Sequence, residues 1–203
     1  MKYIEMEPSK MLNPLPVVLV SCKGTAEDAK PNMITIAWTG TINSDPPMIS
    51  VSIQPRRYSH DLVRDSGEFV VNLTDEALCR KTDLCGVKSG RDTDKFALTG
   101  LRPMEAPGMK YAPAVEGTPA AISCRVRQII PLGSHDLFLG EVVGVLVRPD
   151  LIDDRNAIHL ERAKLIVYNH GLYQKTADVM GYFGYSVSEP EVFRNRMKQY
   201  RKR

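Results

Sequence analysis

Apolar and β-branched residues recur along the chain in short runs that are bounded by turn residues. Several runs alternate apolar and other residues with a period of two, which is typical of strands that bury one face. The pattern predicts seven strands, at residues 16–22, 32–40, 47–53, 68–73, 120–132, 135–147 and 163–169. Gly140 and Gly144 interrupt the sixth run, so we expect β-bulges or sharp bends there.

Helical signals are few and short. Ser59 is placed to cap a helix that ends at Gly67, and the acidic residues after Thr74 are typical of a second helix start. The capping-box pattern at residues 188–191 predicts a C-terminal helix. Long strands with few helices between them favour an antiparallel sheet or a small barrel. A Rossmann fold is disfavoured further, because no G-x-G-x-x-G motif follows a strand.

The composition fits one soluble globular domain. The chain has 203 residues, of which 43% are hydrophobic and 25% are charged. No apolar run approaches the roughly 18 residues of a membrane span, so no membrane association is expected. The N-terminus, MKYIEMEPSK, carries acids where a signal peptide would have an apolar core, which makes a cytoplasmic location the expectation.

The four cysteines form no C-x-x-C pair and lie within or beside apolar segments (Cys22, Cys79, Cys85 and Cys124). We therefore expect reduced, mostly buried thiols, with neither a disulfide framework nor a metal site.

The net charge of +3 comes from one end of the chain. Residues 194–203 carry six Lys/Arg and no acid, which leaves 21 basic and 24 acidic residues elsewhere. A nucleic-acid reader would spread its basic residues over a binding face, so nucleic acid is not the expected partner. A contact with nucleic acid or an acidic partner is the less favoured interpretation of this tail. A terminal amphipathic helix that docks on a second subunit is the simpler one.

Three segments contain candidate chemistry. Arginines 56 and 57 with Ser59 precede a predicted helix start, where free N–H groups and an Arg fork suit a phosphate dianion; a surface salt bridge fits that segment equally well. Polar Asn32 and Thr35 lie in an apolar run that ends at the only tryptophan, Trp38. His135 beside Asp136 could present an oriented imidazole to a ligand, although such a pair is more often an ordinary turn.

Four segments together resemble the flavin reductase-like FMN-binding split-barrel family, in its flavoredoxin and ferric reductase branch. They are NMITIAW (32–38) with DPP (45–47), RRYS (56–59), CGVKSGRDTDKF (85–96) and GSHDLFLGEV (133–142). The resemblance runs from about residue 14 to 173, with an extension from 174 to 203. It implies a mainly β fold, a six-stranded antiparallel Greek-key split barrel with a few short helices and a C-terminal helix. It also implies a homodimer with FMN at the subunit interface.

The resemblance also implies roles for individual residues. Those along the isoalloxazine ring and ribityl chain would be Asn32, Thr35, Ile36, Ala37, Trp38, Ser52, Ile53 and Tyr173. The phosphate would be held by Arg57, Tyr58 and Ser59, with Lys88 and Ser89 reaching across from the 85–96 loop. Either Arg56 or Arg57 could face the phosphate. The charged residues Arg91, Asp92, Asp94 and Lys95 would brace the loop, and His135 would be catalytic, near the flavin face where a nicotinamide could stack.

The function that follows is an FMN-dependent oxidoreductase. It would take a hydride from NAD(P)H and pass electrons to free flavin, a ferric chelate or another small-molecule or protein acceptor. The cofactor supplies such chemistry, so the lack of a Ser-His-Asp or paired-carboxylate set does not oppose it. The alternative is a flavoredoxin-like FMN-binding electron carrier without NAD(P)H oxidase activity.

Overall fold

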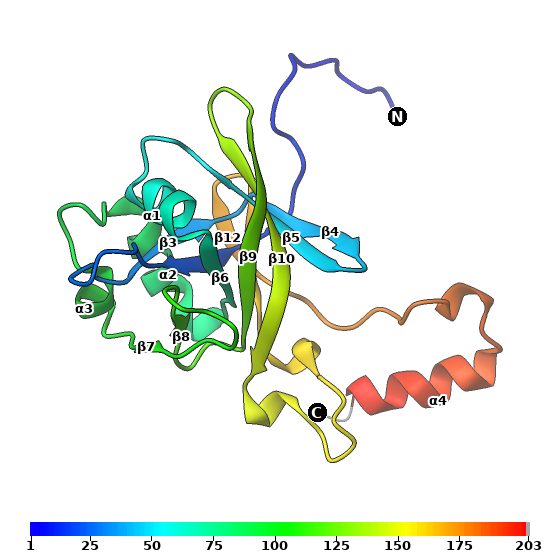
Figure 1. Ribbon diagram of the computed structural model, residues 1–203. Helices are drawn as coiled ribbons and strands as arrows, with labels where there is room; N and C mark the ends of the chain where they lie inside the picture. The colour runs from blue at the N-terminus through cyan, green and yellow to red at the C-terminus, as the bar shows by residue number, and fades with distance from the viewer. Residues whose placement is uncertain (202–203) are drawn as a thin grey trace.

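A computed structural model describes residues 1–201 and is dominated by one antiparallel seven-stranded sheet (Figure 1). Its strand order is β3 (Asn32–Ile36), β2 (Val18–Cys22), β6 (Glu68–Leu73), β9 (Ala120–Pro131), β10 (Asp136–Val147), β5 (Pro47–Ile53) and β4 (Thr39–Ser44). The first six of these strands form a split barrel, as predicted, and β4 extends its edge.

The two edges of the sheet are joined by a very short link. Strands β3 and β4 lie at opposite edges, yet only Ala37 and Trp38 separate them in sequence. The backbone N–H of Ser52 donates to the carbonyl of Trp38 at 2.9 Å, which holds this link against β5. The sheet must therefore curl until its edges approach, and Trp38 lies where they meet.

The barrel is filled by apolar side chains from opposite walls. Phe69 and Phe138 are fully buried in one cluster with Val51 and other aliphatic residues. A Cβ added at Gly140 would lie 2.5 Å from the Phe69 ring, so this position admits only glycine beside that ring. The register between β9 and β10 shifts next to Gly140 and Gly144, which confirms the predicted bulges.

The helices agree with the predictions in place but differ at their starts. Helix α1 (Tyr58–Ser66) ends at Gly67 in the left-handed region, but Arg57 is its N-cap residue and Ser59 lies inside the first turn. The prediction of Ser59 as the cap was therefore wrong. The second start is capped by Asp75, whose carboxylate accepts from the N–H of Leu78, and η1 (Glu76–Leu78) continues into α2 (Cys79–Val87).

The C-terminal helix forms as expected, as α4 (Pro190–Arg201). The hydroxyl of Ser188 donates to the carbonyl of Gly184 and also pairs with the hydroxyl of Tyr182. It is thus engaged with the preceding turn, η4 (Tyr185–Val187). The last two residues of the basic tail, 202 and 203, lie outside the described residues.

Several elements were not predicted. The strand predicted at 32–40 is divided at Ala37 and Trp38, so β4 is a separate strand that was not predicted. Strand β12 (Leu172–Lys175) joins β11 (Ile166–Asn169) and β1 (Leu15–Pro16) in a second, three-stranded sheet. The remaining short elements are α3 (Lys95–Thr99), β7 (Pro103–Met104), β8 (Ala114–Val115), η2 (Pro149–Leu151) and η3 (Leu160–Arg162).

The two ends of the chain extend away from the barrel (Figure 1). The N-terminal residues leave it as an extended arm, and a long connection separates α4 from the last strand. Within residues 1–201, no helix has both the length and the apolar character needed to cross a bilayer. Three of the four cysteines are buried, which confirms the prediction of mostly buried thiols, and none of the four is paired within residues 1–201.

Candidate functional site

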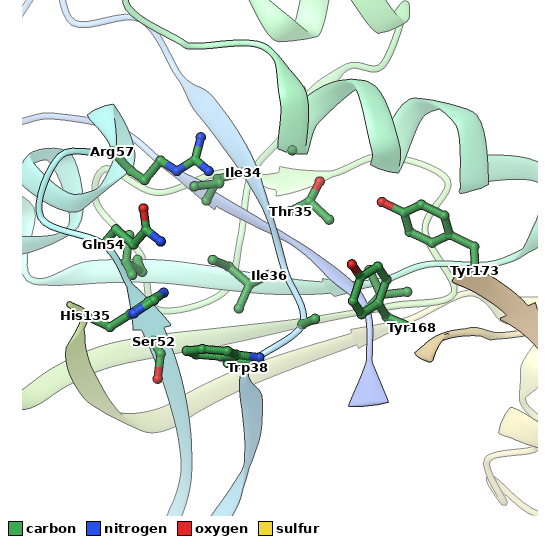
Figure 2. Close-up of a pocket in the computed structure, with 14 residues that line it drawn as sticks. Ile34, Thr35, Ile36, Trp38, Ser52, Gln54, Arg57, His135, Tyr168 and Tyr173 are labelled. Carbon is green, nitrogen blue, oxygen red and sulfur yellow. The ribbon is translucent and has the colours of Figure 1, made fainter. Parts of the chain in front are cut away.

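A cavity of about 270 Å³ opens at the meeting point of the two barrel edges (Figure 2). Its walls come from β3, the end of β5, the residues before α1, the end of α2 and the β11–β12 hairpin. Figure 2 shows Arg57 toward one end and Trp38 at the other. Nine predicted residues line it: Thr35, Ile36, Ala37, Trp38, Ser52, Ile53, Arg57, His135 and Tyr173. We call this the ring cavity because aromatic and aliphatic side chains form most of its wall.

A second cavity of about 270 Å³ adjoins the first and shares Ile34, Arg57 and Gly86 with it. It lies between the N-terminus of α1 and the loop that follows α2, and we call it the anion cavity. The other five predicted residues line it: Asn32, Tyr58, Ser59, Lys88 and Ser89. The structure therefore brings all fourteen predicted residues to two adjoining cavities. Together the cavities provide about 540 Å³, which is within the roughly 300–1,000 Å³ of small-molecule sites.

The anion cavity is strongly positive. Four cations line it, Arg56, Arg57, Lys88 and Lys95, and its lining, all within the described residues, contains no carboxylate. Among the ion pairs of residues 1–201, none involves any of these four side chains. The N-terminus of α1 adds the positive end of a helix dipole. Such a lining suits a phosphate dianion.

Lys95 is the buried member of this set, with 3% of its surface exposed. Its ammonium donates to the backbone carbonyl of Cys85 at 2.7 Å. Burial lowers the pKa of Lys95, and the nearby Arg57 lowers it further, while the thiols of Cys85 and Cys22 oppose the shift. A buried cation beside other cations is costly unless an anion compensates it.

Two polar side chains fix the corner between β3 and α1. The amide nitrogen of Asn32 donates to the hydroxyl of Ser59 at 2.8 Å, and both residues are buried. Gly90 lies against them, because a Cβ there would be 2.4 Å from the Asn32 side-chain oxygen and 2.8 Å from the Tyr58 ring. The 85–96 loop can approach β3 this closely only because it has glycine at this position.

Two charged residues of the 85–96 loop, Arg91 and Asp94, brace it as predicted. Arg91 contacts Asp61 at 3.4 Å and lies over the Tyr58 ring, and Asp94 caps α3 by accepting from the N–H of Ala97. Lys95 also braces the loop, because its ammonium donates to the carbonyl of Cys85, and in addition it lines the anion cavity. The loop thus contributes a cation to the site that the sequence interpretation had assigned to structure.

At the other end, the His135 ring contacts the Trp38 ring, with centroids 4.6 Å apart. Partial burial lowers the pKa of His135, and the charges of Lys10 and Arg57 lower it further. His135 is therefore a neutral imidazole at neutral pH. A neutral ring beside an indole can contact a flat ligand without adding charge.

Asp136 does not orient His135, although the two are adjacent in sequence. Its carboxylate lies 2.8 Å from Nε2 of His60, which is buried on α1. The idea that Asp136 prepares the neighbouring imidazole is therefore wrong. His135 instead has the hydroxyl of Ser134 3.0 Å from its Nδ1.

Two tyrosines and a threonine close the side of the ring cavity near α2. Tyr168 and Tyr173 meet edge to face, with centroids 5.6 Å apart. The Tyr173 hydroxyl donates to Asp83 at 3.1 Å. Burial is the main cause that raises the pKa of Tyr173, and the negative charge of Asp83 is the second. The hydroxyl of Thr35 donates to the carbonyl of Thr82, which ties β3 to α2.

Eight lining residues were given no ligand role in the sequence interpretation: Val17, Ile34, Gln54, Cys85, Gly86, Gly90, Lys95 and Tyr168. Gly86 and Lys95 belong to the 85–96 segment that had already been singled out, and Gln54 lies between Ile53 and the RRYS segment. Tyr168 had no such signal, because it resembles any aromatic residue of a half-buried strand.

Comparison with known proteins gives a family and a fold. A family model described as "Flavin reductase like domain" matches residues 11–176. The flavoredoxin of Desulfovibrio vulgaris (Miyazaki F) superposes with a TM-score of 0.84 at 26% identity, over 93% of this chain and all of that one. An FMN-binding protein from Thermus thermophilus with bound 1-cyclohex-2-enone has a TM-score of 0.72 at 25% identity, over 87% of this chain and 96% of that one.

The relatives found by sequence match over smaller shares of the two chains than these solved structures do. The reductase component of an FADH2-dependent resorcinol hydroxylase from Rhizobium sp. is 26% identical over 131 residues, 64% of this chain and 69% of its own. Five further relatives, all described as uncharacterised, are 26–34% identical over segments that cover between 43% and 83% of their own lengths.

Proposed function

The chain belongs to the flavin reductase-like family, and from this premise we propose that it is an FMN-dependent oxidoreductase. It takes a hydride from NAD(P)H and delivers electrons to free flavin, a ferric chelate or another acceptor. The observation that supports this best is the pair of connected cavities, one lined by aromatic and aliphatic side chains and one by four cations. A flat ring joined to a phosphate has this division of apolar and anionic parts.

The residues present fit FMN. The phosphate would be held by Arg57, Ser59 and the first-turn N–H groups of α1, with Lys88 and Lys95 on the other side. The buried Lys95, which has no acidic partner among the lining residues, is the feature that most requires an anion there. The Thermus protein that the chain resembles is itself described as FMN-binding.

A bound flavin supplies the redox chemistry by accepting two electrons from a reduced pyridine nucleotide. The protein's part is to bind, orient and shield. Trp38 and His135 bound one face of the ring cavity, where a nicotinamide could stack, and the buried floor from Ile36 and Ile53 excludes water from the other side. His135, neutral at neutral pH, adds no charge against an incoming ring.

We further propose that the active unit is a homodimer with FMN at the subunit interface. The ring cavity is open to solvent along the side near Trp38, which is 39% exposed. A second copy would border that opening and complete its wall without closing the route past Trp38. Size-exclusion chromatography with light scattering, with and without FMN, tests this part separately.

The experiment for the main proposal is titration of the purified apoprotein with FMN, followed by anaerobic rapid mixing of the complex with NADH and with NADPH. We expect stoichiometric FMN binding and bleaching of the bound flavin by at least one nucleotide. Replacing Arg57 and Ser59 together by alanine should weaken FMN binding while the chain stays folded. Undiminished FMN affinity in that folded variant would refute the proposed site.

A second candidate function is supported by the similarity to flavoredoxin. In this case the chain carries electrons on FMN between other proteins and has no NAD(P)H oxidase activity. Both candidates predict FMN binding, so the rapid-mixing step decides between them. Failure of both nucleotides to reduce the bound flavin would favour the carrier.

A further inference from the structure

A third cavity, of about 430 Å³, adjoins the ring cavity on its outer side and shares Trp38 and Tyr168 with it. The remainder of its wall comes from the N-terminal arm at residues 9–13, from Leu15 and from the turn at His170 and Gly171. We call it the arm cavity. It begins where the two aromatic side chains of the ring cavity end.

The arm is tied to the framework of the site at this point. The side-chain oxygen of Asn13 accepts from the backbone N–H of His170 at 3.1 Å. Two residues later the chain enters β1, where Leu15 pairs with Tyr168 of β11. The wall of the arm cavity is therefore continuous with the second sheet, although the residues before Ser9 extend away from the barrel (Figure 1).

The arm cavity combines aromatic and aliphatic walls with a cation at its rim. The ammonium of Lys10 lies 5.8 Å from the centroid of the Trp38 ring. The charge of Lys10 also lowers the pKa of His135, so it contributes to the electrostatic potential inside the ring cavity. His170 is the other basic residue of the wall, and neither Asp nor Glu occurs among the wall residues, all of which the structure describes.

A ligand that matches this arrangement has a flat or apolar portion and an anionic group. The anion cavity, which is lined by four cations, lies at the opposite end of the ring cavity, at the N-terminus of α1. The bound cofactor would use that charge. The positive charge near Trp38 is then available to a different molecule.

We propose that the arm cavity binds the anionic part of the small redox partner, with Lys10 as a specificity-determining residue. The reactive part of that partner reaches the ring cavity past Trp38. The chemistry of the anion is a phosphate or a carboxylate, from a pyridine dinucleotide or from a carboxylate chelator of ferric iron. This inference rests on the proposed function, because that function makes the ring cavity the place where electrons are exchanged.

The test uses the FMN-loaded protein and isothermal titration calorimetry with three probes: oxidised NAD⁺, citrate and neutral cyclohex-2-en-1-one. The variants are Lys10→Glu, Lys10→Arg and, as the matched control, Lys2→Glu, which makes the same charge change on the same arm outside the cavity. FMN affinity is measured for each variant first. Failure of the wild-type protein to bind FMN would refute the proposed function. The present inference is tested separately, by the affinities for NAD⁺ and citrate.

We expect Lys10→Glu to weaken binding of at least one anion about tenfold or more, while Lys10→Arg and Lys2→Glu stay within about threefold of wild type. A loss limited to NAD⁺ identifies the dinucleotide as the source of the anion, and a loss limited to citrate identifies the carboxylate. The difference should shrink at high ionic strength, because exposed charges are screened.

Four results would overturn the inference. The first three are failure of the wild-type protein to bind either anion, equal affinities in Lys10→Glu and wild type, and an equal loss in Lys2→Glu. The fourth is a parallel loss of cyclohex-2-en-1-one binding, because that outcome indicates a change of shape and not of charge.

Discussion

The imidazole of His60 and the carboxylate of Asp136 are hydrogen-bonded, with Nε2 and Oδ2 2.8 Å apart. His60 belongs to α1 and is 4% exposed, whereas Asp136 begins β10. The bond joins the helix whose first turn borders the anion cavity to the strand that follows His135. Successive residues of an extended chain point to opposite sides. The GSHD segment therefore serves structure with one residue and the ring cavity with its neighbour.

Substitutions at two adjacent residues should affect different properties: one should lower stability, and the other should slow flavin reduction. Asp136→Ala leaves the buried imidazole of His60 without its partner and should lower the free energy of unfolding by about 1–3 kcal/mol. His135→Ala removes a half-exposed ring and should leave the free energy of unfolding within about 0.5 kcal/mol. His135→Ala should instead slow reduction of the bound flavin. Urea unfolding and rapid mixing measure the two effects, and the reverse assignment would contradict the structure.

Lys95→Met should distinguish the contribution of the phosphate to FMN binding from that of the flavin ring. Loss of a buried charge partner costs roughly 2–5 kcal/mol, so FMN affinity should fall about thirtyfold or more. Riboflavin, which lacks the phosphate, should bind the variant as well as it binds wild type. Without ligand, the variant should be the more stable protein, because methionine carries no buried charge. Calorimetric titration with both flavins and thermal unfolding of the apoprotein check these points; equal losses for FMN and riboflavin would contradict them.

Gly90→Ala should damage the site through shape alone. A Cβ at this position would lie 2.4 Å from the Asn32 side-chain oxygen, so the loop or the Asn32–Ser59 hydrogen bond must move. We expect FMN affinity to fall about tenfold or more, as ordering of the loop against β3 is lost. Gly40→Ala is the matched control, because a Cβ there has no atom within 4 Å. Similar FMN affinities for the two variants would show that the close approach is unimportant.

The pKa of His135 should lie below 6.5 in the folded protein, because burial, Lys10 and Arg57 all disfavour its charged form. The unfolded chain then binds this proton first as the pH falls. The free energy of unfolding should therefore decrease between pH 6.5 and the lower folded pKa, and His135→Asn should remove that decrease. NMR titration of the histidine ring protons measures the pKa directly.

The same titration contains two internal comparisons. Lys10→Gln should raise the pKa of His135 toward 6.5, because it removes one of the two charges that lower it. His159 should titrate above 6.5, because its hydrogen bonds to Asp153 and Glu161 stabilise the charged ring. A folded pKa of His135 at or above that of His159 would contradict the electrostatic account.

The sequence predicted the barrel well where burial produces a pattern. The strands with alternating or continuous apolar residues were found, and Gly140 was correctly placed at a bulge. The structure shows that this bulge lies beside Phe69. Strand β4 was missed because, as an edge strand, it is exposed along most of its length and has no apolar face to mark it. Strand β12 is likewise largely exposed. Such strands are held by backbone hydrogen bonds to one neighbouring strand, and these bonds do not depend on a recognisable pattern of side chains.

For the site, short motifs located residues that patterning alone could not. Fourteen residues line two adjoining cavities, although their individual roles stay predictions. Most of them come from the NMITIAW, RRYS, 85–96 and GSHD segments. The place of Lys95 in the cavity wall was missed because a lysine among Arg, Asp and Asp normally lies in solvent. Its burial depends on where α3 packs against the loop, and no local feature of the sequence specifies that packing.

The two-residue link between β3 and β4 has a practical consequence. Its second residue, Trp38, is the only tryptophan of the chain, so all indole fluorescence originates at the junction of the barrel edges. Emission from this one ring should respond when the edges separate during unfolding, and again when a chromophore occupies the adjoining space. A spectrofluorometer can thus follow assembly and loading of this protein without any added label.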